Sequence, residues 1–244
     1  MIIKQAMVLA AGLGTRMRPI TKTTPKPLVR IGGKPMIDYV LDALVTAGVE
    51  RIVVNVHHHA DQMEAHLATE KRAEIRISNE RDRLMDSGGG LAKGLKLLPQ
   101  DQPALVMNAD LFWVGERDAE PSNLVRLAGQ FDPSRMDMSM LCVDQERTTG
   151  HNGKNDFSMA EDGQLTRYVA GAPNPVVYAG ALALMPHLFH DAPDGPFNLN
   201  IYFDRAISAG RLFGAPLEGQ WLTVGTPDAI APAEAVVARY GGSA

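Results

Sequence analysis

The sequence predicts an α/β fold in which helices flank a central, mostly parallel mixed sheet. Short apolar runs rich in β-branched residues alternate with segments of helical apolar spacing through the first 110 residues. The first of these runs, residues 6–11, ends directly in a glycine turn. Parallel strands joined by crossover helices place a ligand at the carboxyl ends of the strands, so we expect a binding site at that edge.

The first half of the chain is expected to alternate between strand and helix. Residues 6–11 (AMVLAA) form a short apolar run before Gly12-Leu13-Gly14, which indicates a buried strand leading into a tight turn. After Pro35, apolar residues recur at helical spacing until Gly48, where a helix would end. The expected strands are 6–11, 51–56, 74–79 and 104–108, and the expected helices are 36–47, 60–67 and 90–98.

The second half is less regular, because helices no longer separate every pair of strands. It is expected to contain strands at 136–143, 176–185 and 211–216, a hairpin over 157–169, and helices at 197–209 and 228–240. No low-complexity linker or internal repeat divides the chain. We therefore expect one domain over residues 1–244, whose second half extends the sheet and supplies a wall for a second substrate.

The composition is that of an ordinary globular protein. Of 244 residues, 45% are hydrophobic and 21% are charged, which excludes collagen-like, disordered and membrane-spanning classes. The N-terminal residues lack the layout of a secretory signal peptide, so we expect a cytoplasmic protein that binds no membrane. The single cysteine, Cys142, lies in an apolar run and is expected to be an unreactive core residue.

The charges are unevenly distributed along the chain. Residues 1–37 contain seven Lys or Arg and no Asp or Glu, although the whole chain has 24 basic and 28 acidic residues. A basic segment within an acidic chain favours a compact polyphosphate ligand over a nucleic acid, although composition alone also allows a solvated basic loop.

The most specific motif is Leu9–Arg16 (LAAGLGTR), followed by Pro25-Lys26-Pro27. Glycines after a strand allow backbone N–H groups to approach phosphate oxygens, and Arg16 and Lys26 supply positive charge. The motif is not a Walker loop, because no Gly-Lys-Ser/Thr follows, and it is not the dinucleotide fingerprint, because Met17 replaces the third glycine. The string predicts a cradle for a nucleoside triphosphate.

These residues resemble the sugar-1-phosphate nucleotidyltransferase family, whose signature G-x-G-T-R…P-K-P matches Gly12–Arg16 and Pro25–Pro27. The resemblance extends to Asn108–Asp110 and Trp221–Thr226. It implies a Rossmann-like nucleotidyltransferase fold, with residues 1–110 as a nucleotide-binding half and 111–244 as a sugar-binding half. It also implies transfer of a nucleoside monophosphate to a sugar 1-phosphate with Mg²⁺ as cofactor and pyrophosphate as the second product.

Within the family, the short chain, the turn at Ser87–Gly90 and the stretch Gly153–Phe157 are most similar to the uridylyltransferases of peptidoglycan recycling. This similarity implies UTP and N-acetylmuramic acid α-1-phosphate as substrates and UDP-MurNAc as the product. A mannose-1-phosphate guanylyltransferase or another sugar nucleotidyltransferase is the alternative within the family. A non-catalytic nucleotide-sugar sensor is the alternative from another class. A dinucleotide-dependent dehydrogenase is a distant third.

The resemblance assigns a role to each matching residue. Arg16 would stabilise the pyrophosphate, Lys26 the α-phosphate, and Asp110 would bind Mg²⁺. The expected nucleotide-binding residues are Leu9, Ala10, Ala11, Gly12, Gly14, Thr15, Arg16, Lys26, Asn79, Asp86, Ser87 and Gly88. The expected sugar-binding residues are Asn108, Asn155, Asp156, Tyr178 and Gly180. No protein nucleophile is required, no nucleic acid is expected as a partner, and the chain is expected to be a monomer or a small homo-oligomer.

Two further features of the sequence concern metal binding. Many relatives carry a second metal-binding aspartate where this chain has Thr223, so either Asp110 acts with phosphates and waters or another acid such as Asp204 replaces it. The run His57–His59 is interpreted as a polar loop near the nucleotide and not as a zinc site, because it lacks metal-ligand spacing.

Overall fold

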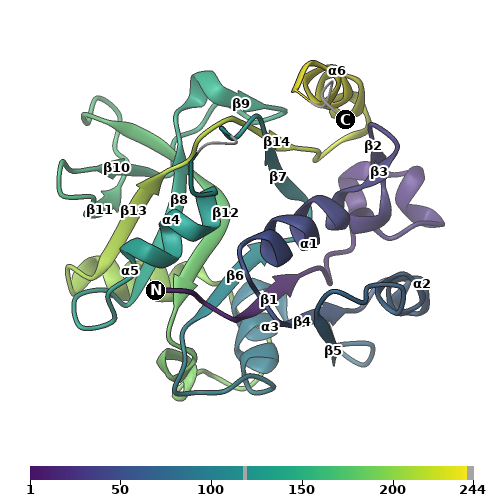
Figure 1. The fold of residues 1–244 in the computed structure, drawn as a ribbon, viewed down its shortest axis with the longest axis horizontal. Coiled ribbons are helices and arrows are strands. Elements are labelled where there is room, and N and C mark those ends of the chain that lie inside the picture. Colours follow the sequence, from purple (N-terminus) through teal and green to yellow (C-terminus); the bar gives the residue numbers. More distant parts are fainter. Residues whose placement is uncertain (118–119, 241–244) are drawn as a thin grey trace.

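A nine-stranded mixed sheet forms the centre of the computed structural model, which describes residues 1–117 and 120–240 (Figure 1). Residues 118–119 and 241–244 of the expected domain lie outside this description. The strands of the first half are all parallel: β1 (Gln5–Leu9) lies between β4 (Arg51–Val56) and β6 (Ala104–Asn108), and β5 (Glu74–Asn79) lies beyond β4. The carboxyl ends of these strands therefore meet at one edge.

The second half continues the sheet from β6 and introduces its antiparallel strands. The long strand β12 (Pro175–Leu184) runs antiparallel to both β6 and β8 (Met138–Val143), and β13 (Leu212–Pro216) pairs parallel with β8. The hairpin of β10 (Phe157–Met159) and β11 (Leu165–Arg167) joins the beginning of β12. The predicted mostly parallel mixed sheet is confirmed.

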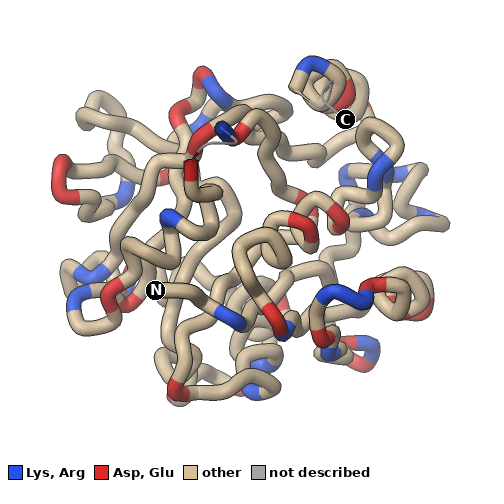
Figure 2. The backbone as a smooth tube through the Cα atoms, viewed as in Figure 1, with Lys and Arg blue, Asp and Glu red and all other residues tan. Residues whose placement is uncertain are grey.

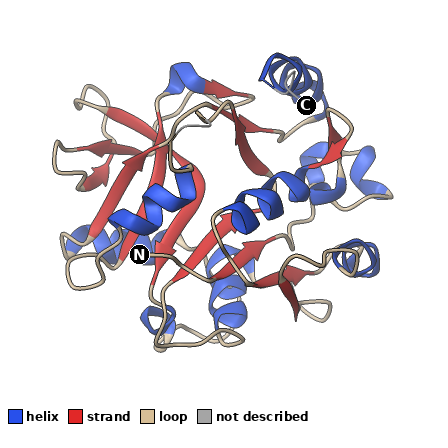
Figure 3. Ribbon diagram, viewed as in Figure 1, coloured by secondary structure: helices blue, strands red, loops and turns tan. Residues whose placement is uncertain are grey.

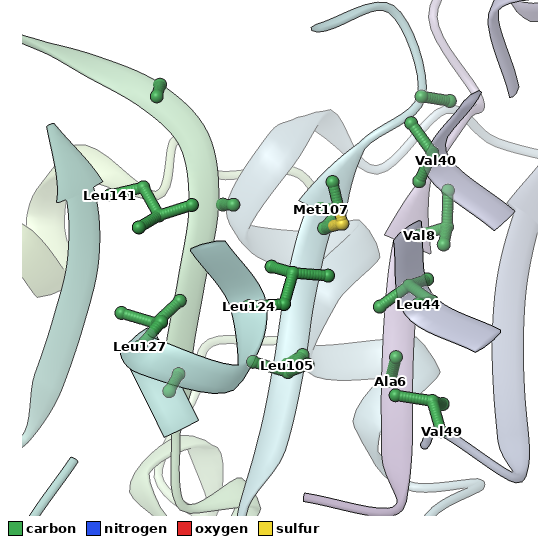
Figure 4. Packing of buried hydrophobic residues seen from close by; sticks show 14 of the residues in the cluster. Ala6, Val8, Val40, Leu44, Val49, Leu105, Met107, Leu124, Leu127 and Leu141 are labelled. Carbon is green, nitrogen blue, oxygen red and sulfur yellow. The ribbon is translucent and has the colours of Figure 1, made fainter. Parts of the chain in front are cut away.

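Helices cover both faces of the sheet (Figure 3). Helices α1 (Met36–Thr46), α2 (Ala60–Leu67) and α4 (Asn123–Gln130) pack on one face, and α3 (Asp86–Leu95) and α5 (Asn200–Ser208) pack on the other. Figure 4 shows the first of these layers, in which α1 and α4 place leucine and valine side chains against β1 and β6. Burial of this apolar surface is the main stabilising contribution to the fold.

A smaller layer lies beside the main sheet. Strands β7 (Leu111–Val114), β14 (Gln220–Thr223) and β9 (Thr148–Thr149) form a three-stranded sheet, and α6 (Ile230–Tyr240) packs against it. A short ribbon of β2 (Arg30–Ile31) and β3 (Lys34–Pro35) contacts α6. These short strands were not predicted from the sequence, because runs of two to four residues carry little periodicity. Helix α4 was not predicted either.

Several predicted boundaries are wrong. Helix α3 begins at Asp86 and not at Gly90, and α5 begins at Asn200 and not at residue 197. Consecutive glycines suggest a turn rather than a helix. Here the tertiary contacts explain them: a Cβ on Gly88 would collide with the Phe197 ring, and a Cβ on Gly89 with the carbonyl oxygen of Gly195.

Among residues 1–117 and 120–240, no helix has both the length and the apolar character needed to cross a membrane.

Candidate active site

The glycine loop that follows β1 is held by its neighbours in a fixed conformation. Gly14 has a φ of 60°, in the left-handed region, and a Cβ on it would lie 2.9 Å from the Thr21 side chain. Thr21 donates its hydroxyl hydrogen to the Gly14 carbonyl oxygen at 2.8 Å, and His58 Nε2 lies 2.8 Å from the Thr21 carbonyl oxygen. The histidine run thus supplies a polar loop that supports the glycine turn, as expected.

Lys26 and Asp110 face each other directly beside this loop. Asp110 follows the carboxyl end of β6, and Lys26 begins the short 3₁₀ segment η3 (Lys26–Leu28). The Lys26 ammonium and an Asp110 carboxylate oxygen form an ion pair, with the lysine side chain 12% exposed and the aspartate 32%. Both line a pocket of about 90 Å³ together with Leu9, Ala10, Gly12, Pro27 and Ala109. The adjacent parallel strands β1 and β6 bring the glycine loop beside Asp110, and the fold of the chain through η3 places Lys26 at the same pocket.

The C-terminal segment Trp221–Thr226 reaches the same place from the small sheet. Thr223 lies opposite Leu111, the residue after Asp110, in the antiparallel pair of β14 and β7. A Cβ on Gly225 would lie 3.5 Å from a terminal nitrogen of Arg16, so the Arg16 guanidinium lies over Gly225. Arg16 belongs to the basic stretch between η1 (Thr15–Met17) and β3, which Figure 2 shows without acidic residues at the right of the view.

The Asp110 carboxylate of this pocket fits a magnesium ion that has a single protein ligand. Asp110 is the partly exposed carboxylate of the pocket. Within the described ranges no group of three or more His, Cys, Asp and Glu side chains forms a closed metal cage. Mg²⁺ commonly binds through one or two carboxylates together with substrate phosphates and water, so a single Asp110 suits it. Asp204 does not supply the second ligand in this structure, because it lies on α5, away from the residues that line the Asp110 pocket, where its carboxylate accepts from Arg167 Nε at 2.7 Å.

The second predicted nucleotide loop lies at the start of α3. Asp86 in this loop is exposed to solvent, whereas Gly88 is buried. Asp86 has a φ of 58°, which is strained for a residue with a side chain. The Gly88 N–H already donates to the Phe197 carbonyl oxygen at 2.9 Å, and the Ser87 hydroxyl accepts from the Leu199 N–H at 3.0 Å. Ser87 therefore does not cap α3. Asn79 ends β5 near this loop and accepts from the Arg81 N–H.

The structure brings three of the five predicted sugar-binding residues together. Asn108, Asp156 and Tyr178 line one pocket of about 230 Å³, which Ser87 also borders. The Asp156 carboxylate accepts from the Tyr178 backbone N–H at 2.9 Å, so its orientation is fixed. Burial raises the pKa of the Tyr178 phenol, which keeps this group neutral.

The other two predicted sugar-binding residues lie elsewhere. Asn155 lines a neighbouring pocket whose other polar residues include Asp144, Glu146 and Glu161, not the Asp156 pocket. Gly180 is buried where β12 shifts its register, and a Cβ on it would collide with the Leu111 side chain. This packing explains the glycine without a ligand, and the roles of both residues stay predictions.

One residue of the sugar pocket was missed by sequence reasoning. Arg167, at the end of β11, is the cationic side chain among the residues that line the Asp156 pocket. It lies over the Phe157 ring at 5.0 Å and donates to Asn200 Oδ1 at 2.8 Å. It belongs to no motif, and the only signal in the sequence is its place at the end of a predicted hairpin strand.

A glycine loop at the carboxyl edge of a parallel sheet, facing a lysine and an aspartate, is the arrangement of an α/β nucleotide-binding protein. The sequence profile of the nucleotidyl transferase family matches residues 5–151. The chain belongs to this family, which confirms the resemblance drawn from the motifs.

The chain is also similar to individual members of this family over nearly its whole length. The chain is 42% identical over 240 residues to an N-acetylmuramate alpha-1-phosphate uridylyltransferase of Caulobacter vibrioides, covering 97% of this chain and 98% of that protein. It is 31% identical over 239 residues to the protein of the same name from Neisseria meningitidis, covering 97% and 99%. A solved UDP-glucose pyrophosphorylase in complex with UDP-glucose has the same fold, with a TM-score of 0.77 at 17% identity over 97% of this chain and 99% of that one.

Proposed function

We propose that this protein transfers uridine monophosphate from UTP to N-acetylmuramic acid α-1-phosphate, giving UDP-N-acetylmuramic acid and pyrophosphate, with Mg²⁺ as cofactor. The observation that carries this proposal is the joint placement of the glycine loop, Lys26 and Asp110 around one pocket at the carboxyl edge of the sheet. The choice of substrates rests on the full-length similarity to N-acetylmuramate alpha-1-phosphate uridylyltransferases.

The reaction needs positioning and charge neutralisation, and no protein nucleophile. An oxygen of the sugar phosphate forms a bond to the α-phosphorus of UTP, the bond between the α-phosphorus and its bridging oxygen breaks, and pyrophosphate leaves with the electron pair. Lys26, partly buried beside the loop, neutralises charge on the α-phosphate, and Arg16 neutralises the departing pyrophosphate. When bound, Mg²⁺ would draw charge from the phosphate oxygens, and Asp110 would hold it.

The Lys26–Asp110 pair preorganises both groups before substrate binds. Each charge is balanced by the other while the site is partly buried, which limits the cost of desolvation. On substrate binding, Lys26 would exchange the Asp110 carboxylate for phosphate oxygens, and Asp110 would then be available to hold Mg²⁺. The ion pair thus keeps both charged side chains at the pocket before substrate binds.

On the sugar side, the Asp156 pocket supplies groups of both polarities. The Asp156 carboxylate accepts hydrogen bonds from sugar hydroxyl or amide hydrogens, and the Asn108 amide can both donate and accept. N-acetylmuramic acid differs from N-acetylglucosamine by a lactyl ether that ends in a carboxylate. Arg167 is a planar donor that pairs well with such a carboxylate, and this supports an acidic sugar as substrate.

The proposal is tested by measuring pyrophosphate release with Mg²⁺ for four nucleotides against four sugars. UTP, GTP, dTTP and CTP are each combined with the 1-phosphates of N-acetylmuramic acid, mannose, glucose and N-acetylglucosamine. We expect the fastest turnover with UTP and N-acetylmuramic acid 1-phosphate. Preference for another pair, such as GTP with mannose 1-phosphate, would keep the reaction class and change the substrates. A repeat with EDTA tests the metal requirement, since full activity without a divalent cation would contradict the role of Asp110.

A non-catalytic nucleotide-sugar sensor is the second candidate, and Thr223 is the observation that favours it. A neutral hydroxyl beside Asp110 is a poorer magnesium ligand than a second carboxylate. Tight binding of a nucleotide sugar without turnover of any pair would support the sensor. For either candidate we propose a cytoplasmic protein that acts as a monomer or a small homo-oligomer.

A further inference from the structure

A buried polar pair lies beneath the two nucleotide loops. Asn55 belongs to β4 and is 3% exposed, and Glu80 follows β5 and is 1% exposed. Asn55 Nδ2 donates to Glu80 Oε1 at 2.7 Å, and the Met85 N–H donates to Glu80 Oε2 at 3.1 Å. Burial of a carboxylate is costly unless its oxygens receive hydrogen bonds, so this arrangement has a structural or functional reason.

The pair connects two loops that are distant in the sequence. The Ala10 N–H, at the start of the glycine loop, donates to Asn55 Oδ1 at 2.6 Å. An unbroken chain of hydrogen bonds therefore runs from Ala10 through Asn55 and Glu80 to Met85, the residue before α3. One end fixes the predicted phosphate loop and the other fixes the loop of Asp86 and Ser87.

The directions of the hydrogen bonds in this connection restrict which two residues can stand at positions 55 and 80. Both end groups, the Ala10 and Met85 N–H, are donors, so the two side chains between them must together accept at both ends and still bond to each other. An amide followed by a carboxylate satisfies this, with the amide oxygen on Ala10 and the amide hydrogens on the carboxylate. Two amides cannot satisfy it, because in either orientation one N–H group would face another N–H group.

The packing around the pair is shaped to admit it. A Cβ on Gly90 of α3 would lie 2.7 Å from Asn55 Nδ2 and 2.8 Å from Glu80 Oε1. Gly90 has no side chain to fill this space, so the helix approaches the pair closely. His57 Nδ1 lies 2.8 Å from the Glu80 carbonyl oxygen and fixes the backbone at that residue.

We infer that Asn55 and Glu80 are positioning residues, which set the spacing between the phosphate loop and the α3 loop and thereby the affinity for the nucleotide. They act through Ala10 and Met85 and contact no substrate themselves. The inference rests on the proposed function, because it requires both loops to bind the nucleotide.

The test is a cycle of three variants with UTP and Mg²⁺ as the titrated probe, measured by calorimetry. In E80Q, one N–H group faces another, and we expect the Kd of UTP to rise about tenfold or more. In N55D, two carboxylates meet in the core, and we expect a loss of at least the same size. The double variant N55D/E80Q reverses the polarity of the pair but satisfies both ends, and we expect its Kd to return to within about threefold of the wild type. E74Q, which removes an exposed carboxylate from β5, is the matched control.

The outcomes distinguish a role of Asn55 and Glu80 in nucleotide binding from a role in the stability of the fold alone. In a folded E80Q variant, the KM for UTP should rise while the KM for the sugar phosphate stays unchanged. If both single variants fail to fold, a folded double variant with near-wild-type affinity still supports the polarity argument. A double variant that is unfolded, or folded with additive losses, overturns it. So does a folded E80Q variant with unchanged affinity.

Gly90→Ala disturbs the pair from outside the hydrogen-bond chain. We expect it to weaken UTP binding in the same direction as E80Q, whereas Gly129→Ala in α4, where nothing lies within 4 Å of the added Cβ, should leave binding unchanged. If the wild type binds no nucleotide, the proposed function fails. Amide exchange at Ala10 and Met85 then tests the connection itself, with faster exchange expected in both single variants and restored protection in the double variant. Equal exchange in all four proteins would overturn the connection.

Discussion

The nucleotide edge and the sugar pocket are built in opposite ways. The proposed nucleotide edge is the carboxyl edge of parallel strands β1, β4 and β6, where a short glycine loop and the Lys26–Asp110 pair line one pocket. The sugar pocket is assembled from side chains on separate elements. These are Asn108 at the end of β6, Ser87 in α3, Asp156 before β10, Arg167 in β11, Tyr178 in β12 and Asn200 in α5.

This difference suggests a division of tasks, in which the nucleotide edge serves the reaction chemistry and the sugar pocket serves the choice of substrate. The glycine loop is held by Thr21 and by a buried amide–carboxylate pair, so under the proposed function it would offer the triphosphate a constant geometry. A pocket lined by side chains from several elements changes its specificity by single substitutions. We therefore expect substitutions at the nucleotide edge to abolish turnover and substitutions in the sugar pocket to alter selectivity.

The largest effect is expected from Lys26 and Asp110. Lys26→Ala and Asp110→Ala should each lower kcat by about 10²- to 10⁴-fold, because each removes charge stabilisation at the reacting phosphates. The melting temperature should change little, because both side chains are partly exposed at a loop. Steady-state kinetics and thermal unfolding measure the two effects.

A matched control for this prediction is Lys34→Gln, which breaks another lysine–aspartate pair, with Asp42, away from the glycine loop. Its activity should remain close to that of the wild type. Near-normal turnover in Lys26→Ala or Asp110→Ala would exclude that residue from the mechanism. It would also remove the expected contrast between the nucleotide edge and the sugar pocket.

A smaller and more selective effect is expected from Arg167→Gln. The KM for N-acetylmuramic acid 1-phosphate should rise about tenfold, because a charge-assisted hydrogen bond is lost, while the KM for N-acetylglucosamine 1-phosphate should not change. Arg205→Gln, on the exposed side of α5 and paired with Asp191, is the control. Equal losses with both sugars would show that Arg167 supports the fold of the pocket and does not read the carboxylate.

A change of a few fold is expected from Thr223→Asp. A carboxylate opposite Leu111 would add an oxygen ligand near Asp110, so the Mg²⁺ concentration for half-maximal activity should fall. Thr223→Asn provides a side chain of the same shape without the charge and should have a weaker effect. An unchanged magnesium dependence in Thr223→Asp would mean that this side chain does not face the metal.

The smallest effect is expected at Cys142, which lies in the core on β8, opposite Tyr178 of β12. Its side chain is buried, and burial raises the pKa of its thiol, so the reactive thiolate is scarce at neutral pH. Iodoacetamide should not modify the native protein at pH 8 and should modify it completely in denaturant, as mass spectrometry would detect. Rapid modification of the native protein would mean that β8 opens readily.

The sequence alone predicted the features that depend on neighbouring residues. The run of residues 6–11 into Gly12–Gly14 and the alternation of strands and helices are local patterns of apolar spacing and turn chemistry. They were sufficient to predict the parallel first half and the edge of the sheet at which we expect the ligand. The family was predicted from the resemblance of Gly12–Arg16 and Pro25–Pro27 to a known signature. Lys26 and Asp110 were also predicted, because their motifs adjoin that edge.

The tertiary structure was needed for contacts between segments far apart in the chain. The register of β14 against β7 sets Thr223 opposite Leu111, and the packing of the hairpin brings Arg167 to the Asp156 pocket. The pairing of β4 with β5 brings Asn55 within hydrogen-bond distance of Glu80, which follows β5. Apolar periodicity specifies which face of an element is buried. It does not specify which distant element covers that face or in what register, because these depend on the packing of all layers at once.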